Sequence, residues 1–103
     1  MSGAAAAEAG STRLFLRLYV AADSPNSSIA RLNLKAYLEA HPAIQAVLET
    51  IDVLVEPERA MLDGVLVTPM LIVTSAGRER RIAGNLRNAE ALEAAIPWQA
   101  AVG

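Results

Sequence analysis

The sequence contains no cysteine among its 103 residues. It can therefore form neither disulfides nor thiolate metal sites, and it lacks the dithiol that thiol–disulfide exchange requires. No apolar stretch approaches the roughly 20 residues that span a bilayer. Residues 1–11 also lack the basic start and the apolar run of a signal peptide. These absences predict a cytoplasmic protein that does not enter a membrane.

Aromatic side chains and excess positive charge are scarce as well. Aromatic residues make up 4% of the chain, and the net charge is -2. Nucleic acids and anionic membrane surfaces select clustered Lys and Arg, so neither is expected as a partner. Ser24 and Ser27 lack a base, because the single histidine, His41, is predicted at the far end of the same helix. No carboxylates or histidine are spaced for a metal site. With no base and no cysteine either, we expect no catalytic, cofactor-binding or metal-binding residues.

The length suits one small domain with one core. We expect an ordered domain over residues 12–98, flanked by a tail at 1–11 and a second tail at 99–103. With so few aromatic residues, the core must consist of Leu, Ile, Val and Ala side chains.

The first part of the domain is predicted to contain a strand. Residues 12–20 alternate in character, which is typical of a strand with two unequal faces. One face carries Leu14, Leu16, Leu18 and Val20, and the other carries Arg13, Phe15, Arg17 and Tyr19.

A helix and a parallel strand are predicted next. Ser24 and Pro25 are typical of a helix start, where the Ser24 hydroxyl would cap free amides and Pro25 has no amide hydrogen to satisfy. The helix should end near Ala40, before Pro42, and residues 46–54 then form a strand parallel to the first. The predicted buried face of the helix consists of Ile29, Leu32, Ala36, Tyr37 and Ala40.

A short helix, a hairpin and a last helix are predicted in the second part of the domain. The short helix starts at Pro57 and ends near Asp63 and Gly64. Residues 69–74 form an apolar strand that should be buried on both faces, and residues 78–83 pair with it as a hairpin. Asn88 caps the last helix. The apolar side of that helix carries Ala89, Leu92, Ala95 and Ile96.

This order, βαβ followed by a short helix and ββα, is the plan of the thioredoxin fold with a four-stranded mixed sheet. Three segments also resemble the signature segments of KaiB proteins, in order and at family spacing. They are LYVAADSPNS (18–27), IDVLVEPERAMLDGVLVTPML (51–71) and RRIAGNL (80–86). The resemblance implies a thioredoxin-like fold, which we expect this chain to favour. The alternative is the KaiB ground state, a tetramer with a rearranged second half.

The resemblance implies a non-enzymatic regulator of a KaiC-type hexameric ATPase, in a circadian clock or a stress-timing system. The resemblance also implies KaiA or a histidine kinase as further partners. It allows this chain to form a homodimer or a homotetramer. An alternative is a stand-alone sensor module that docks on a histidine kinase. A redox or glutathione-dependent enzyme on the same fold is disfavoured by the missing cysteines.

The resemblance also suggests which residues bind the partner. The first loop and the turn before the third strand form the usual ligand face of thioredoxin-like proteins, and the second strand should lie at a sheet edge that a partner strand can join. The expected partner-binding residues are Ala22, Asp23, Ser24, Arg31, Lys35, Thr68 and Pro69. The fold implies a cis bond between Thr68 and Pro69.

A change of fold would involve residues 52–96, where helix and strand preferences compete. The resemblance implies that Pro69, Gly84 and Asn85 influence the equilibrium between the two folds. Asn85 stands where the family usually has Asp. Other departures are Ile29, Val55 and Gly64, which stand where the family often has basic residues. Several of the charges lost in this way help bind partners in better-known members.

Two charged clusters remain. Glu56, Glu58 and Asp63 are predicted to form a solvated helix surface. Arg78 and Arg80 should share one strand face and Arg81 the other. The basic cluster is interpreted as an exposed strand that resists edge pairing or as a contact for an acidic partner.

Overall fold

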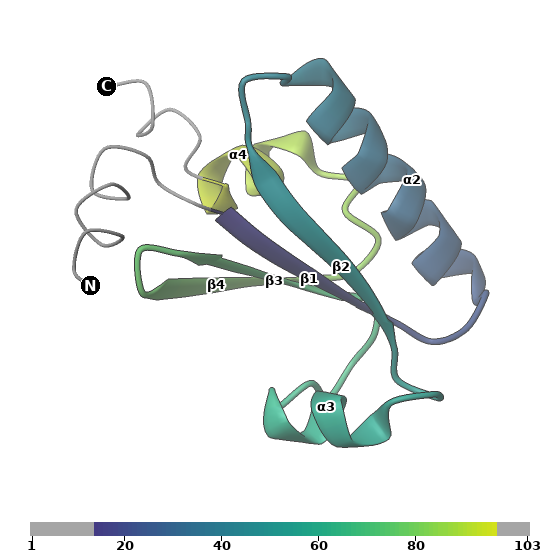
Figure 1. Cartoon of the computed structure of the whole chain (residues 1–103). Helices are drawn as coiled ribbons and strands as arrows, with labels where there is room; N and C mark the ends of the chain where they lie inside the picture. The colour runs from purple at the N-terminus through teal and green to yellow at the C-terminus, as the bar shows by residue number, and fades with distance from the viewer. Residues whose placement is uncertain (1–13, 97–103) are drawn as a thin grey trace.

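A computed structural model describes residues 14–96 (Figure 1). The two expected tails, 1–11 and 99–103, lie outside the described residues. The elements follow the predicted order. They are β1 (Leu14–Val20), α2 (Pro25–Ala40), β2 (Ala46–Asp52), α3 (Pro57–Leu62), β3 (Met70–Ser75), β4 (Arg78–Ala83) and α4 (Ala89–Ala95). None of these helices has the length and apolar character needed to cross a bilayer.

The strands form one mixed sheet in the order β2-β1-β3-β4. β1 and β2 are parallel because the 16-residue helix α2 returns the chain to the same end of the sheet. β3 runs antiparallel to β1, and β4 pairs with β3 as a hairpin. The predicted thioredoxin-like architecture is confirmed, and β2 lies at a sheet edge as expected.

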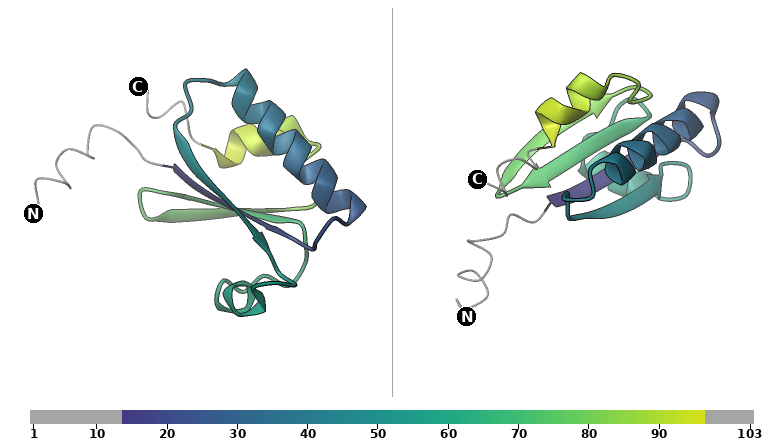
Figure 2. Two further views of the ribbon diagram at one scale, coloured as in Figure 1. Left: turned by 45° about the vertical axis from the view of Figure 1, so that its right-hand side comes forward. Right: turned by 90° about the horizontal axis from the view of Figure 1, so that it is seen from above.

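One face of the sheet is covered by α2 and α4 (Figures 1 and 2). The strand prediction for β1 is confirmed, because the side chains at alternate positions from Leu14 to Val20 all enter this core. Leu71 and Val73 of β3 join them. The larger of the two apolar clusters therefore lies between the sheet and these two helices.

The opposite face carries α3 over only part of its area (Figure 1). Tyr19, Ile51, Ala60 and Ile72 form a second apolar cluster beneath this helix. Because Ile72 points to this face and its neighbours to the other, β3 is buried on both faces, as its apolar run predicted. Phe15, nearer the start of β1, remains exposed.

The predicted buried face of α2 is wrong apart from Tyr37. Leu32, Ala36 and Ala40 are exposed, and Ile29 is only half-buried. The side chains that enter the core are Ser27, Ala30, Leu34 and Tyr37. Ser27 faces inward because its Oγ accepts a hydrogen bond of 3.1 Å from the amide of Ala21. This polar anchor supports the observed rotation. Ala30, Leu34 and Tyr37 also follow helical spacing, but Ile29, Leu32 and Ala36 offer a competing apolar face.

The two helix starts behave differently. Asn88 caps α4 as predicted, since its Oδ1 accepts hydrogen bonds from the amides of Glu90 at 2.9 Å and Ala91 at 3.3 Å. The predicted Ser24 cap is wrong. Ser24 occupies the N-cap position of α2, but its hydroxyl donates to Ser27 Oγ at 2.8 Å instead of accepting from a helix amide.

The predicted apolar side of α4 is confirmed at three of its four positions. Leu92, Ala95 and Ile96 are buried, whereas Ala89 is exposed. Ala89 follows the exposed capping residue directly, so it lies in the part of the first turn that faces solvent.

Candidate partner-binding face

Three loops that carry predicted site residues leave the sheet at the same end. Strand pairing brings Tyr19 opposite Met70, and Met70 opposite Ala83. The loop after β1, the turn before β3 and the loop after β4 therefore start side by side, at the carboxyl end of β1. We call this surface the docking face. Its loop residues are Ala22, Asp23, Ser24, Thr68, Pro69, Gly84 and Asn85.

The loop after β1 is held from two sides. Ala22 has a left-handed backbone with φ 49°, and its amide donates to Asp52 Oδ1 at 3.2 Å. Its carbonyl accepts from Arg31 Nη2 at 3.3 Å, and Arg31 Nη1 lies 3.3 Å from Asp23 Oδ1. Arg31 thus supports the loop in addition to lying near the expected docking surface. Lys35 is exposed one turn further along α2, outside this cluster.

The turn before β3 contains the predicted cis bond between Thr68 and Pro69. Pro69 is buried, and its carbonyl accepts from the amide of Gly84 at 2.9 Å. Asn33 on α2 donates through Nδ2 to the carbonyl of Asn85 at 2.9 Å. Pro69, Gly84 and Asn85, the residues predicted for fold switching, therefore lie in one set of hydrogen bonds that joins β3, the loop after β4 and α2.

Asp52 is a structural residue of this face that the sequence analysis did not single out. Its Oδ1 accepts from the amides of Ala22, at 3.2 Å, and Leu54, at 2.9 Å. One carboxylate thus orders the loop after β1 and the turn after β2. Asp52 lies in the segment from Ile51 that resembles KaiB proteins, but no local pattern indicates its contact with Ala22.

A second network fastens the end of α3 to the sheet. The phenol of Tyr19 donates to Asp63 Oδ2, and Arg17 Nη1 donates to the same oxygen at 2.9 Å. Burial, the hydrogen bond to Asp63 and its negative charge raise the pKa of Tyr19 to about 12. The predicted solvated role of Asp63 is therefore wrong, because distant residues on β1 enclose its carboxylate.

Two arginines complete the attachment of α3. Arg81, on the same sheet face as Arg17, donates to the carbonyls of Asp63 and Gly64 and also pairs with Glu79. Arg59 binds both carboxylate oxygens of Glu49. Hydrogen bonding to Arg59 lowers the pKa of Glu49, and the same contact raises the pKa of Arg59.

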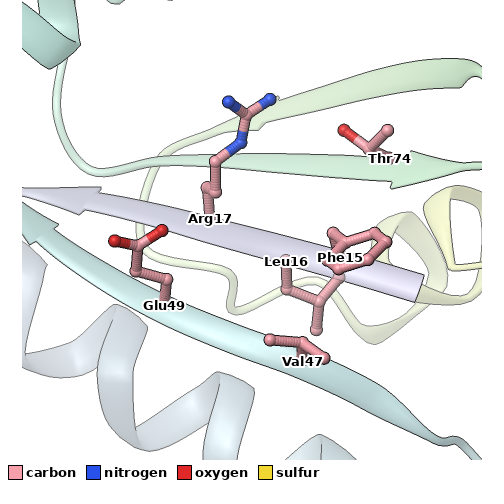
Figure 3. Close-up of a pocket in the computed structure, with 6 residues that line it drawn as sticks. All are labelled: Phe15, Leu16, Arg17, Val47, Glu49 and Thr74. Atoms are coloured by element: carbon pink, nitrogen blue, oxygen red, sulfur yellow. The ribbon is translucent and has the colours of Figure 1, made fainter. Parts of the chain in front are cut away.

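A hollow of about 330 Å³ lies on the sheet face beside this network (Figure 3). Two charged side chains line the hollow, and each forms an ion pair with a residue outside it. Arg17 pairs with Asp63, and Glu49 pairs with Arg59. The hollow therefore offers no free acid and base. Within residues 14–96, no group of three His, Asp or Glu side chains could hold a metal ion. The hollow is lined by Phe15, Leu16, Arg17, Val47, Glu49 and Thr74.

The site is thus built from loops, backbone groups and a sheet edge. Residues 17–98 match the model of the KaiB domain. The chain belongs to the KaiB family. It is 41% identical over 75 residues to the circadian clock oscillator protein KaiB of Prochlorococcus marinus strain MED4, covering 73% of this chain and 70% of that protein. It is 36% identical over 78 residues to KaiB3 of Synechocystis, a circadian clock protein, covering 76% of each.

Solved structures show which of the two KaiB folds is present. The N-terminal domain of SasA from Synechococcus elongatus matches with a TM-score of 0.70 and 24% identity, covering 85% of this chain and 84% of that domain. Mitochondrial thioredoxin 3 of Saccharomyces cerevisiae matches with a TM-score of 0.68 and 21% identity, covering 82% and 76%. This KaiB-family chain has the thioredoxin-like fold, and its KaiB relatives support a role in a circadian clock.

The likeness to thioredoxins extends to the fold only. Redox thioredoxins carry two cysteines in the loop after the first strand, where this KaiB-family chain has residues 23–27 and no cysteine. The same loop is occupied by the Ser24–Ser27 hydrogen bond and the ion pair between Arg31 and Asp23. Its groups are arranged to hold the loop shape.

Proposed function

We propose that this chain is a non-enzymatic, cytoplasmic regulator that binds a KaiC-type ATPase through the docking face, in a clock or stress-timing system. The observation that carries the proposal is the convergence of the three loops at the carboxyl end of β1. Membership of the KaiB family and the names of the curated relatives supply the biological context.

The docking face suits a macromolecular partner. Its loops are fixed before binding by Asp52, Arg31 and Asn33, so little conformational entropy remains to be lost on docking. Beside it, β2 lies at the sheet edge, with unpaired backbone groups that a partner strand can join.

The test measures the affinity of the chain for the KaiC-type ATPase encoded in the same genome. Ala22→Trp and Thr68→Trp place bulk on the docking face, and Lys35→Glu reverses an exposed charge beside it. We expect each to weaken binding by about tenfold or more. Arg78→Glu, on the exposed strand β4, is the control and should bind normally. Unchanged binding in all three site variants would place the docking surface elsewhere.

A second candidate function is docking on a histidine kinase as a stand-alone sensor module. The fold likeness to the N-terminal domain of SasA favours it. Binding assays with the purified ATPase and with the purified kinase separate the two candidates. The true partner should bind the unsubstituted chain and should bind the Thr68→Trp variant more weakly.

A further inference from the structure

Two arginines on strand β4 carry charges that the rest of the described chain does not neutralise. Arg78 and Arg80 are exposed, and no carboxylate within residues 14–96 lies within ion-pair distance of either. They are two positions apart and therefore share one face of the strand. Ile82, two positions further, packs against the larger apolar cluster, so this is the sheet face that carries α2 and α4. We call Arg78 and Arg80 the basic pair.

The other two charged residues of β4 are engaged on the opposite face. Arg81 pairs with Glu79 at 2.7 Å and donates to the carbonyls of Asp63 and Gly64. Glu79 also lies 4.0 Å from Arg17. The charges on the face of α3 are therefore balanced within the chain, whereas the basic pair remains available to a partner.

The basic pair borders a row of unpaired backbone groups. β4 is the last strand of the sheet, and along residues 78–83 only one of its sides is paired, with β3. On the other side, alternate amides and carbonyls face away from the sheet, where a further strand can bond them. Charged residues on an edge strand oppose such pairing in general. A strand that neutralises the two charges is the exception.

A hollow of about 320 Å³ continues this surface beyond the basic pair. It lies where β4 meets the loop before α4, and its lining includes Ile82, Leu86 and Ala91. Arg87 also lines it and has no ion pair within residues 14–96. Because side chains on one face of a strand recur at every second residue, a strand paired with β4 would place one side chain opposite Ile82, at the hollow.

We propose that β4 binds an extended acidic segment of a partner protein, which adds to the sheet as a fifth strand. Two acidic side chains at alternate positions pair with Arg78 and Arg80, and an apolar side chain two positions from the nearer one enters the hollow at Ile82. Main-chain hydrogen bonds supply affinity, and the two charges select the sequence. This inference does not rest on the proposed function, because the basic pair lies outside the docking face.

Other occupants suit this surface less well. A second copy of β4 paired about this stretch would bring arginine close to arginine, and like charges on facing strands are destabilising. A nucleic acid cannot pair with the backbone groups of a strand edge, and no aromatic residue for base stacking stands between Arg78 and Asn88. The net charge of -2 also opposes binding of a long polyanion.

The test follows the backbone amides of the full chain by NMR during titration with a capped peptide of sequence TLTETET. We expect shifts that depend on peptide concentration in residues 78–83 and in the loop that follows. The matched peptide TLTKTKT places lysine where the first has glutamate, and it should bind about tenfold more weakly or less tightly still. The affinity for TLTETET should fall with added salt, because exposed ion pairs are screened.

Substitutions of the basic pair test the charge selection. Arg78→Gln and Arg80→Gln should each weaken binding of TLTETET by about twofold to fivefold. The double variant Arg78→Glu, Arg80→Glu should reverse the preference and bind TLTKTKT more tightly than TLTETET. Lys35→Gln is the matched control, because it removes one exposed cation of α2 and should leave the affinity unchanged.

Several outcomes would overturn the inference. Absence of binding by TLTETET, or equal binding of the two peptides, would show that β4 does not select an acidic strand. Shifts confined to β2 would place the peptide on the other edge of the sheet. Binding of a twelve-nucleotide oligothymidylate that depends on the basic pair, by a chain that does not bind TLTETET, would assign the arginines to nucleic acid.

Discussion

The phenol of Tyr19 donates a hydrogen bond to the carboxylate of Asp63, 44 positions later in the chain, and this contact fastens α3 to the sheet. Arg17 donates to the same carboxylate oxygen, so a neutral donor and a cation share one acceptor. The contact joins β1 to the end of α3, and thereby fixes the connection that leads to Thr68 and Pro69. The position of the docking face thus depends on residues that do not belong to it.

Asp63→Ala should lower the free energy of unfolding by about 1.5–3 kcal/mol, the usual range for hydrogen bonds to a charged group. Urea unfolding measures the change. Tyr19→Phe should lose less, because Arg17 still pairs with the carboxylate. The control is Glu79→Ala, which removes an exposed carboxylate that lies 4.0 Å from Arg17 and 2.7 Å from Arg81, and should change stability by less than about 1 kcal/mol. A control effect equal to that of Asp63→Ala would contradict the central role given to Asp63.

Stability should also decline at alkaline pH because of Tyr19. Its pKa in the folded chain is about 12, against an ordinary value of 10.0. The folded state therefore favours the neutral phenol, and this contribution is fully present below pH 10 and is lost as the pH rises towards 12. Urea unfolding across this window should show a decline that Tyr19→Phe reduces. An identical decline in the variant would assign it to other groups.

Asn88→Ala should destabilise the chain by about 1 kcal/mol, since it removes the side-chain acceptor for two amides of α4. Asn88→Asp is the matched variant, because it keeps an acceptor oxygen and should retain most of the stability. Thermal unfolding of the two variants measures the difference. Equal loss in both would mean that the amide group of Asn88, and not its acceptor oxygen, matters.

Gly84→Ala should shift the balance between the two expected folds. Gly84 has φ 104°, which disfavours any side chain, and its amide holds the carbonyl of Pro69. We expect a second set of NMR peaks for residues 52–96 and an oligomer in size-exclusion chromatography. Gly77→Ala is the control, because Gly77 has φ 77° in the hairpin turn and should only destabilise. A single set of peaks in Gly84→Ala at all concentrations and temperatures would contradict the switch.

The order of elements could be predicted because its signals are local. Alternation in β1, the apolar run of β3 and the Asn88 cap each depend on neighbouring residues. The rotation of α2 is ambiguous from apolar residues alone, because they occupy two competing faces of the helix. The buried hydrogen bond of Ser27 lies on the observed face, with Ala30, Leu34 and Tyr37. The family resemblance placed the loop residues, and strand register brought them together. The contacts of Asp63 and Asp52 join residues too distant in the chain for any pattern to show them.

Hydrogen exchange of the chain, alone and saturated with the KaiC-type ATPase from the same genome, tests the central claim most directly. The docking face predicts slower exchange at residues 22–24, at Thr68 and at residues 84–85, with little change in β4. Protection confined to β4, or no protection at all by a fully assembled ATPase, would contradict the account.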